Sequence, residues 1–222
     1  MPQIQRWLIM ANGSYGADSE ETKSWYRSQS KGFHKILCAD GGTNHARRLD
    51  IRPDQIVGDM DSIDPIEQRF MEEQQVEFHL VPAEKDVTDT QLAMDIAARG
   101  DAGEIVIWGG AGDRLDHTLA NLFSAVPYAK AGIGIRFDSP ELTIHLVNHE
   151  LILQGTPGDT VTVLSLLPEA KDVTLTDFYY PLKHATLDAF HPVGVSNLMT
   201  GETAHIQVGE GSLAVFHIKS IV

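Results

Sequence analysis

The sequence contains a single cysteine, Cys38, and its apolar runs are far shorter than the roughly 20 residues that cross a bilayer. An internal disulfide is therefore excluded, and the apolar neighbours of Cys38 predict a buried strand residue without a chemical role. The N-terminus shows no charged segment followed by an apolar stretch and a small-residue cleavage site. We therefore expect a cytoplasmic protein with no membrane span and no secretory signal.

Positive charge is also scarce, because 17 Lys and Arg face 31 Asp and Glu, which gives a formal net charge of −14 at pH 7. Nucleic-acid binding relies largely on neutralised phosphates, so this class of partner is disfavoured. An acidic protein can still bind a small anionic ligand if a divalent cation supplies the missing positive charge. The length of 222 residues predicts one or two compact domains.

Up to about residue 138, short apolar runs alternate with longer segments of helical period, which predicts a mostly parallel sheet with helices on both faces. The expected strands are 7–11, 35–39, 55–58, 76–81, 104–108 and 132–137, and the expected helices are 19–30, 43–49, 65–74, 87–99 and 115–130. Ligands bind at the carboxyl ends of the strands in such sheets.

From Pro140 onward the pattern changes to strand-length runs separated by Gly, Pro and Asp turns, which predicts a small antiparallel sandwich or barrel. The expected strands are 141–147, 150–154, 160–166, 172–177 and 213–218. We therefore expect the α/β class, with a first domain over residues 1–140 and an all-β sandwich domain over residues 141–222.

Two carboxylates, Asp59 and Asp61, follow the apolar run 55–58. In an extended backbone, side chains at i and i+2 point to the same side and lie roughly 6–7 Å apart, so both can approach one hard cation. The alternative is that the aspartates cap the next turn, which is the more common role of an isolated Asp-x-Asp. Their position directly after a strand favours a magnesium site.

A second polar cluster, residues 85–91, lies at the entrance of the helix expected over 87–99. Asp86 and Asp89 could simply cap this helix and complement its dipole. A lysine beside two acids and two hydroxyls is also what a metal–polyphosphate site requires, with Lys85 on phosphate oxygens and one aspartate on the metal. Both interpretations stay open for this cluster alone.

A glycine-rich segment, residues 109–117, lies between the strand 104–108 and the helix 115–130. Glycines permit backbone N–H groups to approach an anion, the helix N-terminus adds a favourable dipole, and Arg114 supplies a planar donor fork. Both common nucleotide fingerprints are absent, because no Walker A pattern occurs and Leu115 occupies the last position of Gly-x-Gly-x-x-Gly. An ordinary tight turn is an equally good interpretation of this segment alone.

Two further turns, residues 39–44 and Asn12-Gly13, also follow expected strands. Each is an ordinary turn when taken alone. All five segments lie at strand carboxyl ends, however, where a parallel sheet gathers its loops into one cleft. Four acids, Lys85, Arg114 and several glycines in one cleft would suit a nucleotide–magnesium complex.

In their order and spacing, these segments resemble the thiamine pyrophosphokinase family, and the resemblance extends to Gly194-Val195-Ser196-Asn197 in the all-β part. It implies that residues 1–140 bind the nucleotide and catalyse the reaction, while 141–222 bind thiamine and dimerise. The implied reaction moves the pyrophosphoryl group of ATP to the hydroxyethyl group of thiamine and releases AMP. The implied assembly is a homodimer whose sites lie at the subunit interface.

By this resemblance, Asp59, Asp61 and Asp89 are Mg²⁺ ligands, and together with Arg114 and Asp116 they form the catalytic set. The expected ATP-binding residues are Asn12, Gly13, Asp40, Gly41, Gly42, Asn44, Lys85, Asp86, Thr88, Gly110 and Arg114. The expected thiamine-binding residues are Gln91, Asp116, Ser196 and Asn197. One departure concerns the tryptophan on which animal and fungal members stack thiamine near the C-terminus. Phe216 would replace it here only if its side chain points into the site.

Other functions remain compatible with these residues. A pyrophosphokinase acting on another heterocyclic alcohol, such as a hydroxymethyl pterin, would have the same nucleotide half, although Ser196-Asn197 favours thiamine. A non-catalytic nucleotide or thiamine sensor is disfavoured because it has little need for a complete metal site. A phosphatase with Asp59 as nucleophile would form a phosphoaspartate and need no second substrate.

Overall fold

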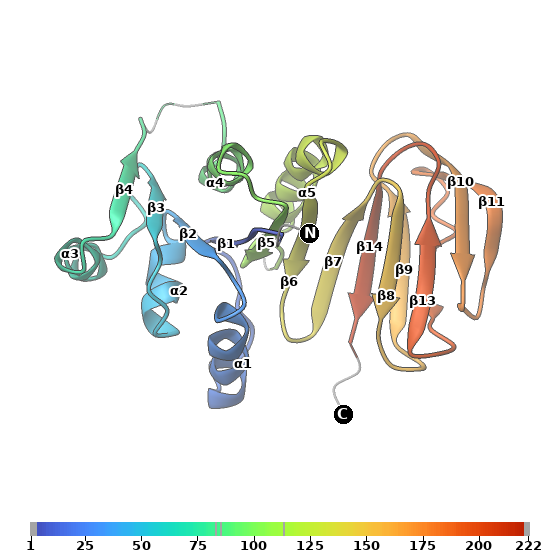
Figure 1. Ribbon diagram of the computed structural model, residues 1–222, viewed down its shortest axis with the longest axis horizontal. Helices are drawn as coiled ribbons and strands as arrows, with labels where there is room; N and C mark the ends of the chain where they lie inside the picture. Colours follow the sequence, from blue (N-terminus) through green and yellow to red (C-terminus); the bar gives the residue numbers. More distant parts are fainter. Residues whose placement is uncertain (1–3, 83, 85, 113, 220–222) are drawn as a thin grey trace. The chain divides into compact units, whose positions relative to one another are not determined.

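The computed structural model describes residues 4–82, 84, 86–112 and 114–219, which form two compact units (Figure 1). The first unit contains the residues up to Tyr128 together with Gly132–Ser139. The second unit begins at Pro140 and also includes Ala129–Ala131. Among the described residues, no helix combines the length and the apolar character that a membrane crossing needs.

The sheet of the first unit has the strand order β6-β5-β1-β2-β3-β4, with every neighbouring pair parallel. Helices α1, α2 and α3 cover one face of this sheet, and α4 and α5 cover the other (Figure 1). The architecture confirms the predicted α/β class. The strands are β1 (Arg6–Met10), β2 (Lys35–Ala39), β3 (Gln55–Gly58), β4 (Glu77–Leu80), β5 (Glu104–Trp108) and β6 (Gly134–Asp138). The helices are α1 (Glu20–Ser30), α2 (Gly42–Arg48), α3 (Pro65–Glu73), α4 (Asp89–Arg99) and α5 (Leu115–Lys130).

The central strands are buried on both faces because helices cover the sheet on each side. In β1, Leu8 and Met10 belong to the core cluster that also contains Tyr26 of α1 and Trp108 of β5. The rings of Tyr26 and Trp108 pack edge to face, with centroids 4.8 Å apart. This apolar packing fixes the strands whose C-terminal ends carry the polar loops.

Side-chain caps set the starts of three helices. Ser19 Oγ accepts a hydrogen bond from the Thr22 amide at 3.1 Å, and Asp64 Oδ1 accepts one from the Ile66 amide at 2.8 Å. Thr88 Oγ1 accepts one from the Gln91 amide at 3.1 Å. Because Thr88 is the cap, α4 begins at Asp89, two residues later than expected.

The second unit is a β-sandwich, as predicted. One of its sheets contains strands in the order β12-β9-β14-β7, and the other has the order β11-β10-β13-β8. Side chains from both sheets, among them Val161, Val163, Val173, Ile206 and Val215, form one buried cluster. The strands are β7 (Leu142–Val147), β8 (Glu150–Gln154), β9 (Thr160–Ser165), β10 (Glu169–Thr176), β11 (Leu182–Asp188), β12 (Asn197–Leu198), β13 (Thr203–Gln207) and β14 (Leu213–Ile218).

Three strands of this sandwich, β11, β12 and β13, were not predicted. In β11 only Leu187 is fully buried, and β12 has two residues, so neither segment has a strong apolar alternation. Strand β10 is longer than expected because its pairing with β11 shifts register between Ala170 and Val173. Asp172 lies inside this irregularity with φ 56°, which an alternation of side chains does not reveal.

Candidate active site

The first unit contains a cavity of about 710 Å³ at the C-terminal ends of β1, β2 and β5 and the N-termini of α4 and α5. The strand order reverses at β1, with β2 on one side and β5 on the other, and parallel sheets bind ligands at this position. Several residues predicted from the sequence line this cavity: Asn12, Gly13, Asp40, Thr88, Asp89, Gly110 and Arg114.

Three carboxylates converge at this sheet edge. Asp40 follows β2, Asp59 follows β3 and Asp89 begins α4, and each offers an oxygen within 4.8 Å of the other two. Asp40 is only 6% exposed, and its Oδ1 has no hydrogen-bond partner among the described residues. Clustered carboxylate oxygens are the ligands that Mg²⁺ and Ca²⁺ prefer, so the donor set fits a hard divalent cation.

The electrostatics of this cluster also favour a cation. Burial raises the pKa of Asp40, and the negative charges of Asp89, Asp61 and Asp59 raise it further, while a hydrogen bond from Ser62 opposes the shift. The four carboxylates therefore repel one another when all are ionised. A divalent cation at this position would remove the repulsion.

The structure gathers Asp40 rather than Asp61 with Asp59 and Asp89. The extended backbone expected over residues 59–61 is wrong, because Met60 has φ 66°. The segment forms a turn in which Asp59 Oδ1 accepts a hydrogen bond from the Asp61 amide at 3.3 Å. Asp61 Oδ1 accepts a hydrogen bond from Ser62 Oγ at 2.9 Å. Direct ligation of a metal by Asp61 therefore stays a prediction.

Glycines allow close contacts between the loops around the cavity. A Cβ on Gly13 would lie 2.1 Å from the Gly109 carbonyl oxygen, and one on Gly42 would lie 1.9 Å from the Met10 oxygen. Gly109 also has φ 66°, which a side chain would strain. A Cβ on Gly41 would lie 2.3 Å from Asn12 Nδ2. These glycines bring the loops after β1, β2 and β5 together.

Asn44, predicted to bind ATP, anchors the loop after β3 in this structure. Its Nδ2 donates to the Ser62 carbonyl at 2.9 Å, and its Oδ1 accepts from the Asp64 amide at 2.9 Å. Both ends of the amide are therefore used within the protein. In this structure Asn44 acts as a positioning residue for the loop that follows Asp59 and Asp61.

Arg114 and Asp116 form a bidentate pair at the N-terminus of α5. Arg114 Nε lies 2.9 Å from Asp116 Oδ1, and Nη2 lies 2.6 Å from Oδ2. Hydrogen bonding to Arg114 holds the pKa of Asp116 well below its usual range. The Arg114 side chain is 70% exposed, so its guanidinium can exchange the carboxylate for another anion.

The other residues predicted in the polar cluster 85–91 lie in different environments. Asp86 is exposed, and Thr88 uses its hydroxyl oxygen to cap α4. The backbone carbonyl of Gln91 accepts a hydrogen bond from the Tyr128 hydroxyl at 3.4 Å. Lys85 lies outside the described residues.

In the second unit, the neighbouring residues Ser196 and Asn197 have opposite settings. Ser196 is exposed, with φ 57°, and its amide donates to Thr162 Oγ1 at 3.0 Å. Asn197 is 3% exposed, and its amide group is used by Tyr180: Oδ1 accepts from the Tyr180 amide at 2.9 Å and Nδ2 donates to the Tyr180 carbonyl at 2.8 Å. Ser196 is therefore available to a ligand, whereas Asn197 fixes the backbone.

Two exposed tyrosines were missed by the sequence analysis. Tyr179 and Tyr180 are each 64% exposed, and their rings pack edge to face with centroids 4.8 Å apart. The Tyr179 amide donates to the Leu198 carbonyl at 2.9 Å, so the pair lies beside the segment that carries Ser196. Consecutive aromatic residues before Pro181 were the available sequence signal.

Phe216 lies on the same sheet face as Thr162, whose side chain contacts the Ser196 backbone. It is the pairing partner of Thr162 in β9, and directly paired residues point to the same side of a sheet. Thr162 in turn accepts the hydrogen bond from the Ser196 amide. Replacement of the thiamine-stacking tryptophan by Phe216 stays a prediction.

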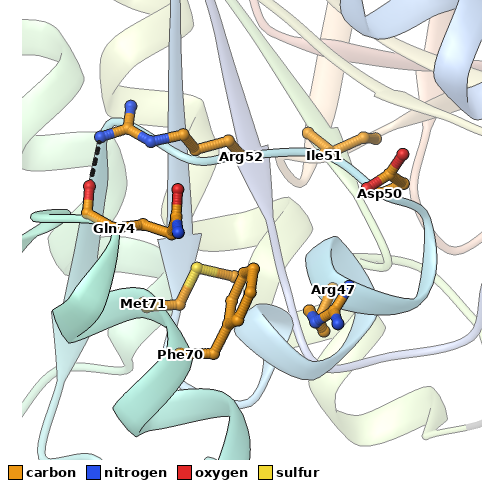
Figure 2. Close-up of a pocket in the computed structure, with 7 residues that line it drawn as sticks. All are labelled: Arg47, Asp50, Ile51, Arg52, Phe70, Met71 and Gln74. Atoms are coloured by element: carbon orange, nitrogen blue, oxygen red, sulfur yellow. Dashed lines mark hydrogen bonds between the residues drawn. The ribbon is translucent and has the colours of Figure 1, made fainter.

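A second cavity, of about 170 Å³, lies between α2 and α3 (Figure 2). Its two guanidinium groups already have partners, because that of Arg47 lies 4.2 Å from the Phe70 ring centroid and Arg52 Nη2 donates to the Gln74 carbonyl at 2.9 Å. The wall contains neither a carboxylate cluster nor a glycine-rich loop among its described residues. The larger cavity is therefore the better candidate for a catalytic site.

Both units are similar to known proteins. A family model described as "Thiamin pyrophosphokinase, catalytic domain" matches residues 26–137, and one described as "Thiamin pyrophosphokinase, vitamin B1 binding domain" matches residues 145–213. A thiamine pyrophosphokinase of Bacillus subtilis is 31% identical over 187 residues, covering 80% of this chain and 84% of the relative. Thiamine pyrophosphokinase 1 of Oryza sativa is 25% identical, covering 77% of this chain and 74% of the relative.

Solved structures give the same result for the fold. The thiamine pyrophosphokinase of Bacillus subtilis superposes with a TM-score of 0.84 at 23% identity, covering 98% of this chain and all of that chain. A thiamin pyrophosphokinase family protein of Enterococcus faecalis gives a TM-score of 0.77 at 26% identity, again over 98% of this chain and all of that one.

Proposed function

Because the chain belongs to the thiamine pyrophosphokinase family, whose enzymes make thiamine diphosphate and AMP from thiamine and ATP, we propose that its active site is the cavity at the C-terminal ends of β1, β2 and β5. The observation that carries this assignment is the convergence of Asp59 with Asp40 and Asp89, two carboxylates that line the cavity. A triphosphate needs charge neutralisation at the place where its phosphorus atom is attacked. An acid cluster that fits a divalent cation provides the position for it.

Magnesium is the metal proposed for this site. Asp40, Asp59 and Asp89 would hold it, with Asp61 either as a further ligand or as a support of the turn after Asp59. When bound, Mg²⁺ supplies positive charge to the polyphosphate and to the leaving AMP. The carboxylates keep that charge at a fixed point beside the loops that receive the phosphates.

The phosphate-binding part of the proposal rests on loops and one exposed cation. The loops of Gly13 and Gly110 present backbone close to the ligand, and Arg114 meets phosphate oxygens after releasing Asp116. Asp116 is then free to contact the cationic thiamine. Thr88 and Lys85 complete the predicted phosphate contacts, and Gln91 is assigned to thiamine.

The second unit is proposed to bind thiamine through Ser196 and to form a homodimer. Asn197 supports this part by holding Tyr180 rather than by touching the substrate. Three apolar side chains precede Ser196 in the sequence and are widely exposed: Phe190 at 80%, Val193 at 71% and Val195 at 51%. We assign them to the dimer contact, because a two-fold interface would cover them on both chains.

We propose that each active site combines the acid-lined cavity of one subunit with the Ser196 segment of its partner. Its ligands are ATP and thiamine, and nucleic-acid binding is not part of the proposed function. A cytoplasmic location is proposed because the reaction consumes ATP. Cell fractionation with an antibody to the chain tests the location, and enrichment outside the cytoplasmic fraction would contradict it.

The decisive experiment measures AMP formation with Mg²⁺ and ATP, with and without thiamine. We expect AMP and thiamine diphosphate in equal amounts, and neither product after EDTA treatment. Turnover with a hydroxymethyl pterin but not with thiamine would instead assign the other heterocyclic alcohol. Binding of both ligands without AMP release would indicate a sensor, and phosphate release without a second substrate would indicate a phosphatase.

A further inference from the structure

His45, which the sequence analysis did not single out, lines the proposed nucleotide cavity together with Tyr15 and Arg48. The imidazole stacks on the Tyr15 ring, with centroids 4.3 Å apart and planes 23° apart. Tyr15 is itself 2% exposed, and its hydroxyl donates to the Ala11 carbonyl at 3.1 Å. A rigid, buried ring therefore supports His45 from behind.

Arg48 determines which imidazole nitrogen carries the proton. Arg48 Nη2 lies 3.2 Å from His45 Nδ1. A guanidinium can only donate, so Nδ1 accepts this hydrogen bond and the proton of the neutral ring resides on Nε2. Nε2 has no hydrogen-bond partner among the described residues, which leaves one N–H donor of fixed position in a partly exposed ring.

The chemistry of this ring matches a nucleobase better than a phosphate. Burial and the charge of Arg48 lower the pKa of His45 to about 4, so the ring is neutral near pH 7 and offers no charge to an anion. The carboxylate cluster and the glycine-rich loops already account for the polyphosphate part of the cavity. A flat, neutral ring with one donor is suited to a flat ligand group with an acceptor nitrogen.

We infer that His45 is the residue that recognises the nucleobase, with its Nε2–H donating to a ring nitrogen of the purine of ATP and Arg48 acting as the positioning residue that fixes its tautomer. This inference rests on the proposed function, because it takes ATP as the ligand of the cavity. It adds a specificity-determining residue that neither the glycine motifs nor the acid cluster supplies.

The test uses 1-deaza-, 3-deaza- and 7-deaza-ATP, each of which lacks one acceptor nitrogen of the purine ring. Dissociation constants of ATP and the three analogues are measured by calorimetry with Mg²⁺ for the whole protein and for His45→Phe. In the unchanged protein we expect one analogue to bind about three- to tenfold more weakly than ATP, which is the effect of one lost neutral hydrogen bond. In His45→Phe, ATP should weaken by a similar factor and that analogue should equal ATP.

Two controls make the outcome specific. His205→Phe changes an exposed histidine of the second unit in the same way and should leave the four constants unchanged. Arg48→Met should reduce the discrimination among the analogues, because Nδ1 is then no longer required to accept. Equal binding of all four nucleotides by the unchanged protein, or an identical pattern in His45→Phe, would overturn the inference. If the unchanged protein formed no AMP in the presence of thiamine, the proposed function would be contradicted instead. The two results can be told apart because the nucleotide dissociation constants are measured without turnover.

Discussion

Asn197 holds the backbone of Tyr180 with both ends of its side-chain amide, accepting at 2.9 Å and donating at 2.8 Å. Its Oδ1 also accepts a hydrogen bond from the Leu198 amide at 3.0 Å. The neighbouring Ser196 is exposed, so two adjacent residues that resemble one substrate motif have separate tasks. Asn197 sets the backbone, and Ser196 is available to the ligand.

The first prediction separates these two tasks. Asn197→Asp keeps the acceptors but loses the donor to the Tyr180 carbonyl and places a charge in a buried position, so we expect a loss of about 1–3 kcal/mol in the free energy of unfolding. Ser196→Ala should leave that free energy unchanged and raise KM for thiamine. Urea unfolding and steady-state kinetics measure the two effects, and a stable Asn197→Asp protein would refute the positioning role.

The second prediction concerns the metal. Asp59→Asn and Asp89→Asn keep the side-chain shape but lose the charge that holds a cation, so kcat should fall by orders of magnitude while the fold persists. Mg²⁺ should raise the Tm of the unchanged protein and have little effect on either variant. Asp61→Asn provides the comparison: an equal loss of activity and of the Mg²⁺ effect would make Asp61 a ligand, and a small loss would assign it to the turn.

The fold could be predicted because apolar periodicity follows burial, and β2, β3, β5, α5, β8 and β14 have the expected bounds. Sequence patterns do not contain the contacts between loops. The convergence of Asp40 with Asp59 and Asp89 depends on two crossovers and on the left-handed turn at Met60. The spacing of Asp59 and Asp61 could therefore not indicate that Asp40 joins this cluster. For the same reason the sequence does not reveal that Asn197 bonds Tyr180, which is 17 residues away in the chain.

The third prediction is a pH dependence of stability from His45. Its folded pKa of about 4 lies below the unfolded value of 6.5, so between these values the unfolded chain binds a proton that the folded chain does not. Its contribution to stability is therefore complete above pH 6.5 and is lost as the pH falls toward 4. His45→Phe removes this dependence. As the pH is lowered from 7 to 5, the urea midpoint of the unchanged protein should fall relative to that of His45→Phe, and parallel curves would contradict the assignment.

The last prediction tests whether two subunits share each site. If Ser196 of one chain faces the acid-lined cavity of its partner, each variant lacks a different half of the shared site. The Asp59→Asn chain has a damaged acid cluster, and the Ser196→Ala chain has a damaged thiamine-binding segment. A mixed dimer then contains one site with both residues intact, so mixing the two variants after unfolding and refolding together should restore activity that neither has alone. Random pairing makes about half of the dimers mixed, each with one of two sites intact, so about a quarter of the full rate is expected.

The comparison depends on Ser196→Ala being severely impaired by itself, which its own kinetics establish before mixing. Two controls accompany the mixture: the variants refolded separately and then combined without further exchange, and Asp59→Asn refolded together with Asp89→Asn. The second pair damages the same half of the site, so no mixed dimer has an intact site and no recovery is expected. If light scattering at micromolar concentration shows a fully active monomer, each chain builds its whole site by itself. Complementation between two chains is then not possible.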